Sequence, residues 1–195
     1  MPPRAPVFQM QFPCEQVAEL AGRFPAVDDI SGHAAGTAAR ARGHYRRAEF
    51  IVVCAWKTAR SAPKVAVNTE AAVIRATRTA LADPDETVRM QALLGLTGVG
   101  VPTASTLLYF AFPDDYPILD VRALDSLCVM GRSTYPVNFW LAYLKACREL
   151  AERCAVSLRT LDKALWQYSK ERSQHARSSP SDRLAPAWSS ASDCR

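Results

Sequence analysis

Apolar residues along most of the chain recur at intervals of three and four, which is the spacing of one face of an α-helix. The predicted helices cover residues 14–23, 44–60, 70–82, 86–96, 102–110, 121–130, 136–154 and 158–172. No stretch alternates apolar and polar residues in the way that a half-buried strand does. The sequence therefore predicts an all-α fold.

Two regions lack this periodicity. Residues 26–43 are rich in Gly, Ala and Asp, which predicts a long connection with one loose helical turn and a solvated His33. From residue 173 onward Ser, Pro and Ala dominate, so residues 173–195 are predicted to form a disordered tail. Residues 1–172 then make up one helical domain.

Helix ends are marked by polar residues that commonly cap helices. Asn68 or Thr69 is expected to cap the helix that follows them, and Ser157 to cap the last helix. Asp83-Pro84-Asp85 separates two predicted helices.

Residues 96–120 contain a turn, Gly98-Val99-Gly100, between two predicted helices. Glycine has no Cβ, so it allows turn geometry and a close approach of a ligand to the backbone. Pro102 suits the first turn of the next helix, where a missing N–H is no loss. A helix start offers unpaired N–H groups and a positive dipole end, which suit a phosphate. The segment therefore predicts a grip on a nucleic-acid backbone that does not depend on sequence.

The hairpin and the acidic residue that follows it resemble one known family. The residues that carry the resemblance are Leu96-Thr97-Gly98-Val99-Gly100, then Thr103-Ala104-Ser105, then Pro117-Ile118-Leu119-Asp120. This pattern is similar to that of the helix-hairpin-helix DNA glycosylase superfamily. In that superfamily the hairpin binds DNA phosphate, and an Asp at the start of the next helix assists cleavage of the N-glycosidic bond of an extruded base. Asp120 lies at the matching distance from the hairpin.

The resemblance implies a two-lobed helical bundle of the endonuclease III type. Residues of about 44–133 would form the central lobe, the first and last helices the other, and DNA would lie across the cleft between them. The residues implied as DNA contacts are Thr97, Gly98, Val99, Gly100, Thr103 and Arg122. Arg122 either reaches the phosphate or pairs with an acidic neighbour, and the sequence leaves both open.

Two positions depart from the family pattern. Thr97 stands where the family often has Pro, which is a mild difference in a turn. Pro102 stands where members with lyase activity carry a catalytic Lys, and Pro has no amine that could form a Schiff base. The resemblance therefore implies a monofunctional enzyme that uses water as its nucleophile.

Asp120 suits the chemistry of base removal. Breaking a base–sugar bond builds positive charge on the sugar, and a nearby carboxylate stabilises that charge and orients water. The base must first be flipped out of the duplex. Asp is also among the best helix N-cap residues, and both roles can coexist. Asp125, one turn further, is expected to face solvent.

The net charge of +5 permits nucleic-acid binding without requiring it. The six cysteines follow no secretory signal, so we expect a cytoplasmic protein with reduced thiols that works without contact with a membrane. Cys147 and Cys154 are spaced like the start of the iron–sulfur loop of endonuclease III-like proteins, but only Cys194 follows. A cluster needs four closely spaced thiolates. We therefore expect no cluster, no other metal and no cofactor, and a monomer acting on duplex DNA.

Several further residues have two interpretations each. Trp56 beside Lys57 either borders a base pocket or belongs to the core. The basic cluster at the entry of the 44–60 helix either contacts phosphate or is solvated; it comprises Arg40, Arg42, Arg46 and Arg47. Four aromatic residues between hairpin and Asp120 are core, with one of them a candidate for stacking on the flipped base: Tyr109, Phe110, Phe112 and Tyr116.

Three functions fit these observations to different degrees. A monofunctional DNA glycosylase that removes a damaged or modified base explains both the hairpin and Asp120. A non-catalytic DNA-binding protein of the same fold explains the hairpin alone. An interaction protein without DNA contact fits the composition but leaves Gly98-Val99-Gly100 unexplained.

Overall fold

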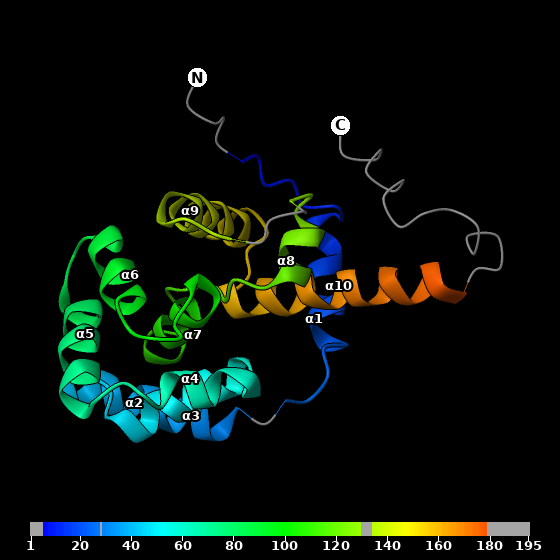
Figure 1. The fold of residues 1–195 in the computed structure, drawn as a ribbon. Coiled ribbons are helices and arrows are strands. Elements are labelled where there is room, and N and C mark those ends of the chain that lie inside the picture. The colour runs from blue at the N-terminus through cyan, green and yellow to red at the C-terminus, as the bar shows by residue number, and fades with distance from the viewer. Residues whose placement is uncertain (1–5, 28, 130–133, 179–195) are drawn as a thin grey trace.

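The computed structural model describes residues 6–27, 29–129 and 134–178, and these contain helices and no strand (Figure 1). The predicted all-α class is therefore confirmed for this part of the chain. The elements are η1 (Cys14–Gln16), α1 (Val17–Gly22), α2 (Ile30–Arg42), α3 (Arg47–Lys57), η2 (Ala59–Ser61), α4 (Ala62–Val65), α5 (Glu70–Ala82), α6 (Glu86–Leu94), α7 (Val101–Ala111), α8 (Val121–Ser126), α9 (Val137–Arg153) and α10 (Leu158–Ser178).

The 26–43 segment is not the long connection that the sequence predicts, because it contains helix α2. Gly32 and Gly36 of α2 are buried against Phe110 of α7, and a Cβ on Gly36 would come within 2.0 Å of the Phe110 carbonyl oxygen. The small residues that weaken the helix signal thus allow α2 to lie directly on α7. His33 also lies on this helix rather than in a loop, with its ring edge-on to Phe110 at 5.1 Å.

Other helix ends also differ from the prediction: α3 covers Arg47–Lys57 instead of residues 44–60, and α6 ends at Leu94 instead of residue 96. Helix α10 continues to Ser178, so residues 173–178 are helical and the predicted tail starts too early; residues 179–195 lie outside the described residues. Helix α8 ends at Ser126, before the predicted end at 130, which lies outside the described residues.

The predicted caps are found. Thr69 Oγ1 accepts a hydrogen bond from the Ala72 N–H at 3.2 Å, and Ser157 Oγ accepts one from Thr160 at 3.1 Å. Asp85 caps α6.

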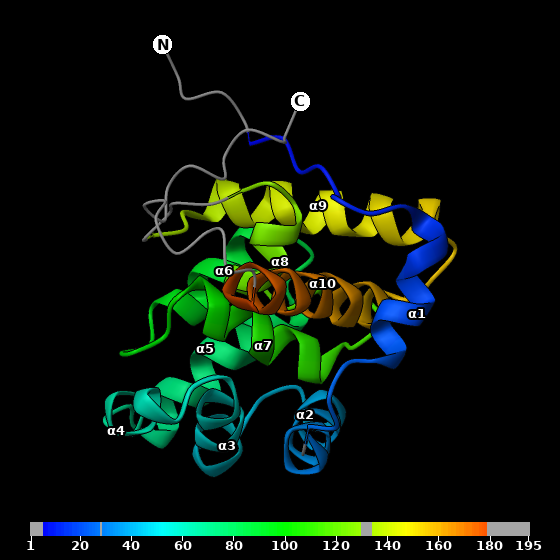
Figure 2. The same cartoon turned by 90° about the vertical axis from the view of Figure 1, so that its right-hand side faces the viewer.

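Two helices organise the packing (Figures 1 and 2). Helix α7 is buried along its length except for Pro102, and it packs against α2, α3 and α6. Helix α10 packs against α1, α8 and α9, so the first and last helices are in contact. Helix α2 packs on α3 and α7, and the short helix α8 packs on α10.

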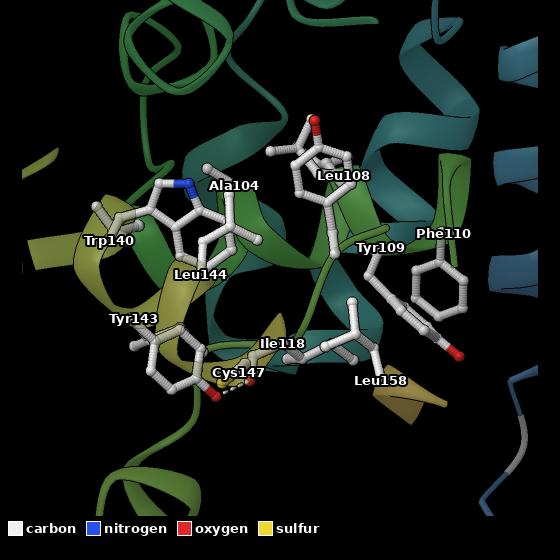
Figure 3. Close-up of a cluster of buried hydrophobic side chains, with 14 of the residues drawn as sticks. Ala104, Leu108, Tyr109, Phe110, Ile118, Trp140, Tyr143, Leu144, Cys147 and Leu158 are labelled. Atoms are coloured by element: carbon white, nitrogen blue, oxygen red, sulfur yellow. Dashed lines mark hydrogen bonds between the residues drawn. The ribbon is translucent and has the colours of Figure 1, made fainter. Parts of the chain in front are cut away.

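The connection from α7 to α8 crosses this core in an extended form, and side chains from three helices hold it. The Ile118 N–H donates to Asp162 Oδ2 of α10 at 2.9 Å, and the Ile118 carbonyl accepts from the Tyr143 hydroxyl of α9 at 3.1 Å. The Leu119 N–H donates to Ser105 Oγ of α7 at 3.0 Å. Figure 3 shows Ile118 with Tyr143 and Cys147 on one side and Leu158 on the other. The backbone that leads into Asp120 is therefore fixed.

The expectation of reduced thiols is wrong for Cys14, Cys128 and Cys154, which are disulfide-bonded. Cys14 and Cys154 form a disulfide with an S–S distance of 2.05 Å, across a sequence separation of 140 that local spacing does not reveal. Cys54 and Cys147 are buried free thiols, and burial raises the pKa of the Cys54 thiol to about 12. The helices of the described residues include none with both the length and the apolar character needed to cross a bilayer.

The α2–α7 contact yields a stability prediction. Gly36→Ala should lower the free energy of unfolding by about 1–3 kcal/mol or more, because the added methyl meets the backbone of α7. Gly22→Ala is the matched control, since a Cβ there meets nothing within 4 Å and alanine favours a helix. Urea unfolding of the two variants measures the difference, and equal stabilities would contradict the close packing of α2 on α7.

Candidate functional site

A pocket of about 200 Å³ lies beside Asp120. For scale, an engineered cavity of about 150 Å³ binds benzene, so this pocket has room for one substituted aromatic ring. Its lining comes from the segment after α1, the end of α3, the start of α8 and from α10. The lining residues are Phe24, Val27, Trp56, Lys57, Ile118, Asp120, Ala123, Arg159, Asp162 and Trp166.

Asp120 is both the N-cap of α8 and a pocket residue. Its Oδ1 accepts the Arg122 N–H at 2.9 Å, and its Oδ2 pairs with Lys57 Nζ at 2.9 Å. Burial opposes the charge on Asp120, but Lys57 and the Arg122 N–H outweigh it and keep the pKa of this carboxyl below its ordinary value. The pocket therefore holds a charged carboxylate at a fixed helix start.

Asp162 is a second carboxyl in the same pocket, and it was not a predicted site residue. It is only 6% exposed, and its Oδ2 accepts the Ile118 N–H. Burial raises the pKa of Asp162 to about 7, against the opposing effects of the Ile118 N–H, Arg159 and Lys57. The sequence contained one signal for it, because Asp162 shares the helix face of the buried Leu158 and Leu165.

The aromatic walls of the pocket are Phe24, Trp56 and Trp166. Trp56 combines its two interpretations, because it lines the pocket and also packs against the core, with its ring 4.9 Å from that of Phe110. Trp166 has the Arg122 guanidinium 5.2 Å from its ring centroid and the Phe24 ring at 5.1 Å. Phe24 and Trp166 were missed because they come from segments about 140 residues apart.

None of the four aromatic residues between hairpin and Asp120 lines this pocket. Tyr109, Phe110 and Tyr116 are buried in the core, and Phe112 packs against it. Arg122, whose partner the sequence left open, lies over Trp166, and its charge also favours the charged form of Asp120.

The hairpin is held in place by Asn68. The Asn68 side chain accepts the Thr97 N–H and donates to the Thr97 carbonyl, both at 2.9 Å. Gly98 has the left-handed φ of 79° that the turn requires, whereas Gly100 is extended, with φ −102° and ψ 174°. Thr97, Gly98 and Gly100 are exposed. The predicted contact residues that are buried are Val99 and Thr103, so Thr103 can reach a phosphate only through its backbone N–H.

Most of the basic cluster is engaged within the protein. Arg42 pairs with Glu49, Arg47 Nε donates to the Asn68 carbonyl at 2.9 Å, and the Arg40 guanidinium lies 5.2 Å from the Phe112 ring centroid. Arg40 and Arg46 are exposed, so phosphate contact and solvation both stay open for them. Asp125 is not solvent-facing as predicted: it pairs with Arg172, and its side chain is 13% exposed.

Lys57 supplies the pocket with a primary amine. Pro102 at the hairpin supplies no amine, but the end of α3 places the Lys57 amine in the pocket, against Asp120. An ammonium paired with a carboxylate has no free lone pair, so in this arrangement Lys57 acts as a counter-ion.

The ion pair gives a prediction about charge. Lys57→Met should raise the pKa of Asp120, because it removes the nearest positive charge while burial of the carboxyl remains. Lys145→Met is the control, since Lys145 pairs with Glu149 on an exposed face of α9. Carboxyl titration by NMR measures the effect, and an Asp120 pKa unchanged in the Lys57 variant would contradict the assigned pair.

The site thus combines a charged carboxylate, a carboxyl of raised pKa, two cations and aromatic walls in one pocket. Such a set can bind a planar ring, stabilise positive charge and transfer a proton. Among the described residues no group of three or more His, Cys, Asp or Glu side chains is arranged to hold a metal ion. Comparison of the chain with models of protein families, with curated proteins and with solved structures found no match in any of the three.

Proposed function

We propose that this protein is a monofunctional DNA N-glycosylase that flips a damaged or modified base into the pocket and hydrolyses its glycosidic bond. The observation that supports this most directly is the charged Asp120, fixed at a helix start inside a pocket with room for one ring. The two-lobed glycosylase architecture and the DNA contacts of the hairpin belong to the same proposal.

The proposed reaction needs a surface for the base, a negative charge near the sugar and a group that orients water. In the proposed complex the flipped base packs against the aromatic pocket walls, which include Trp56 and Trp166, and the deoxyribose lies near Asp120. As the bond from C1′ to the base breaks, positive charge grows on the sugar ring, and the Asp120 carboxylate stabilises it. Water attacks C1′, with Asp120 orienting it and accepting a proton.

The hairpin and Asp120 are mechanically linked, which supports a joint role. Ser105 Oγ donates to the Pro102 carbonyl at 2.8 Å and accepts the Leu119 N–H at 3.0 Å. One side chain therefore connects the first turn of α7 with the residue before Asp120. A phosphate held at the hairpin would have a fixed relation to the carboxylate, which is what positioning in catalysis requires.

The Lys57 amine supports a second candidate activity. If bound DNA separated Lys57 from Asp120, the freed amine could attack C1′ and form a Schiff base. Borohydride trapping distinguishes the two: the proposed water mechanism gives no covalent protein–DNA adduct and no strand cleavage before alkali. A trapped adduct that disappears in Lys57→Met would replace it.

The non-catalytic alternative also has a supporting observation, because both Asp120 oxygens already have partners within the protein. In that case Asp120 is a helix cap and the protein binds DNA without acting on it. Duplex binding without release of any base would favour this alternative.

Asp120→Asn is the sharpest test of the proposed reaction. Asn still caps α8 and keeps the size of the side chain, but it removes the negative charge that stabilises the sugar cation. Base release should fall by about 10²-fold or more, while duplex binding stays at least as tight. The measurement is alkali-revealed abasic sites in duplexes carrying 8-oxoguanine, hypoxanthine, 7-methylguanine or uracil.

Asp125→Asn is the matched control, since Asp125 pairs with Arg172 outside the pocket. It should release base at the parental rate. Parental activity in the Asp120 variant would reduce Asp120 to a helix cap, and the absence of base release by the parent would contradict the proposed enzyme.

Gly100→Val tests the hairpin. Gly100 has an ordinary extended φ, and a Cβ there meets only Pro102 Cδ at 3.8 Å, so the variant should fold. The added bulk should weaken binding to any duplex, because phosphate contacts do not read sequence. Fluorescence anisotropy with unmodified duplexes measures this. Gly98 is the poorer site, since replacement strains a φ of 79° and crowds Lys64. Unchanged affinity of folded Gly100→Val would remove the hairpin from the DNA interface.

A further inference from the structure

We propose that Asp162 is a second catalytic residue of this pocket, a general acid that protonates the departing base while Asp120 stays charged. This inference rests on the proposed glycosylase function and assigns the proton that the reaction needs. It also narrows the substrate class to bases that leave poorly without protonation.

Asp162 and Asp120 bring two carboxyl groups into one pocket from different helices. Both side chains line the same pocket, Asp120 from the start of α8 and Asp162 from α10. The contacts that hold the Asp162 carboxyl are made to one oxygen, Oδ2: the Ile118 N–H at 2.9 Å and Arg159 Nη1 at 3.9 Å. The carboxyl is thus oriented by the protein and borders the space that a base would occupy.

The surroundings push the protonation states of the two carboxyls apart. Burial and the negative charge of Asp120 favour the neutral form of Asp162, against the Ile118 N–H, Arg159 and Lys57, and its pKa rises to about 7. The pKa of Asp120 is lowered, because it has the direct Lys57 partner. A pair of carboxyls with separated pKa values is the arrangement that divides acid and base roles in enzymes.

With Asp162 as the proton donor, every proton and electron pair of the hydrolysis is accounted for. Asp162 gives its proton to a ring nitrogen or carbonyl oxygen of the base, and the electron pair of the bond to C1′ leaves with the base. Water adds to C1′ and loses a proton to Asp120, which passes it to solvent and is a carboxylate again. Asp162 then regains a proton from solvent. The sum is hydrolysis to the free base and an abasic site, with no other reactant.

This role predicts which bases depend on Asp162. A neutral base such as hypoxanthine or 8-oxoguanine leaves more easily after protonation, so it needs the acid. A base with a fixed positive charge, such as 7-methylguanine, leaves as a neutral molecule and does not. A purely structural Asp162 would make no such distinction, because its hydrogen bond to Ile118 serves every substrate equally.

Asp162→Asn separates the two roles. Its amide oxygen can still accept the Ile118 N–H, but an amide carries no proton to donate at neutral pH. Single-turnover base release is measured from pH 5 to 9 with the same four duplexes, using the full chain, Asp162→Asn, Asp120→Asn and the Asp125→Asn control.

For the parent, release of a neutral base should fall as the pH rises through about 7, where Asp162 loses its proton. Asp162→Asn should be slower by about 10²-fold on neutral bases and should lack this decline. Release of 7-methylguanine should change by less than about threefold, since this step needs no general acid.

The protonation of Asp162 in the folded protein can be tested without DNA. The pKa of Asp162 is raised in the folded state, so the parent should lose stability relative to Asp162→Asn as the pH rises from the ordinary value of 3.8 to about 7. Urea unfolding measures this difference. A stability difference that does not vary with pH would overturn the protonated Asp162.

The outcomes separate the two proposals. If Asp120→Asn is inactive but Asp162→Asn keeps the parental rate and pH profile, the general-acid role is wrong and the glycosylase remains. If the parent releases no base from any duplex, the proposed function fails, and the acid role falls with it.

Discussion

The arrangement depends on an extended segment, residues 116–120, that crosses a helical core. No strand among residues 6–27, 29–129 and 134–178 lies beside it to satisfy its backbone. Buried N–H and C=O groups without partners are costly, so side chains have to supply the hydrogen bonds. Ser105, Tyr143 and Asp162 do this for Ile118 and Leu119, each from a different helix. The same contacts fix the position of Asp120 and place a buried carboxyl beside it. The requirement for backbone satisfaction thus produces a site with two acidic groups in different environments.

The charges in the pocket are balanced within the protein. Lys57 lies against Asp120, and Arg159 lies near Asp162. Burying a carboxylate without a partner costs much free energy, whereas a nearby positive charge offsets part of this cost. Burial acts on both carboxyls: Lys57 at 2.9 Å and the Arg122 N–H outweigh it at Asp120, whereas the Ile118 N–H and Arg159 at 3.9 Å do not offset it at Asp162. A pocket that already contains one negative and one neutral carboxyl needs little rearrangement to stabilise a sugar cation and protonate a base.

Local patterns predicted most of the helices, the turn at Gly98 and the cap at Asp120, because periodicity, backbone conformation and capping act over a few residues. Helix α2 was the exception. What the sequence could not predict depends on contacts between distant segments. Gly32 and Gly36 look like linker residues until Phe110 of α7 is seen against them. The Cys14–Cys154 bond and the pocket wall formed by Phe24 and Trp166 likewise join the two ends of the chain. Asp162 was visible only as an acidic residue on an apolar helix face, a pattern that does not by itself reveal its partner.

In the proposed reaction, Asp120 stabilises positive charge on a deoxyribose. The most direct measurement compares the affinity of the full chain for two duplexes that differ at one position. One carries a pyrrolidine nucleotide, whose protonated ring nitrogen mimics the sugar cation, and the other carries the neutral tetrahydrofuran analogue. We expect the cationic duplex to bind more tightly by about 10²-fold, as transition-state analogues do, and Asp120→Asn to abolish the difference. Equal affinity of the parent for the two duplexes would contradict this role of Asp120.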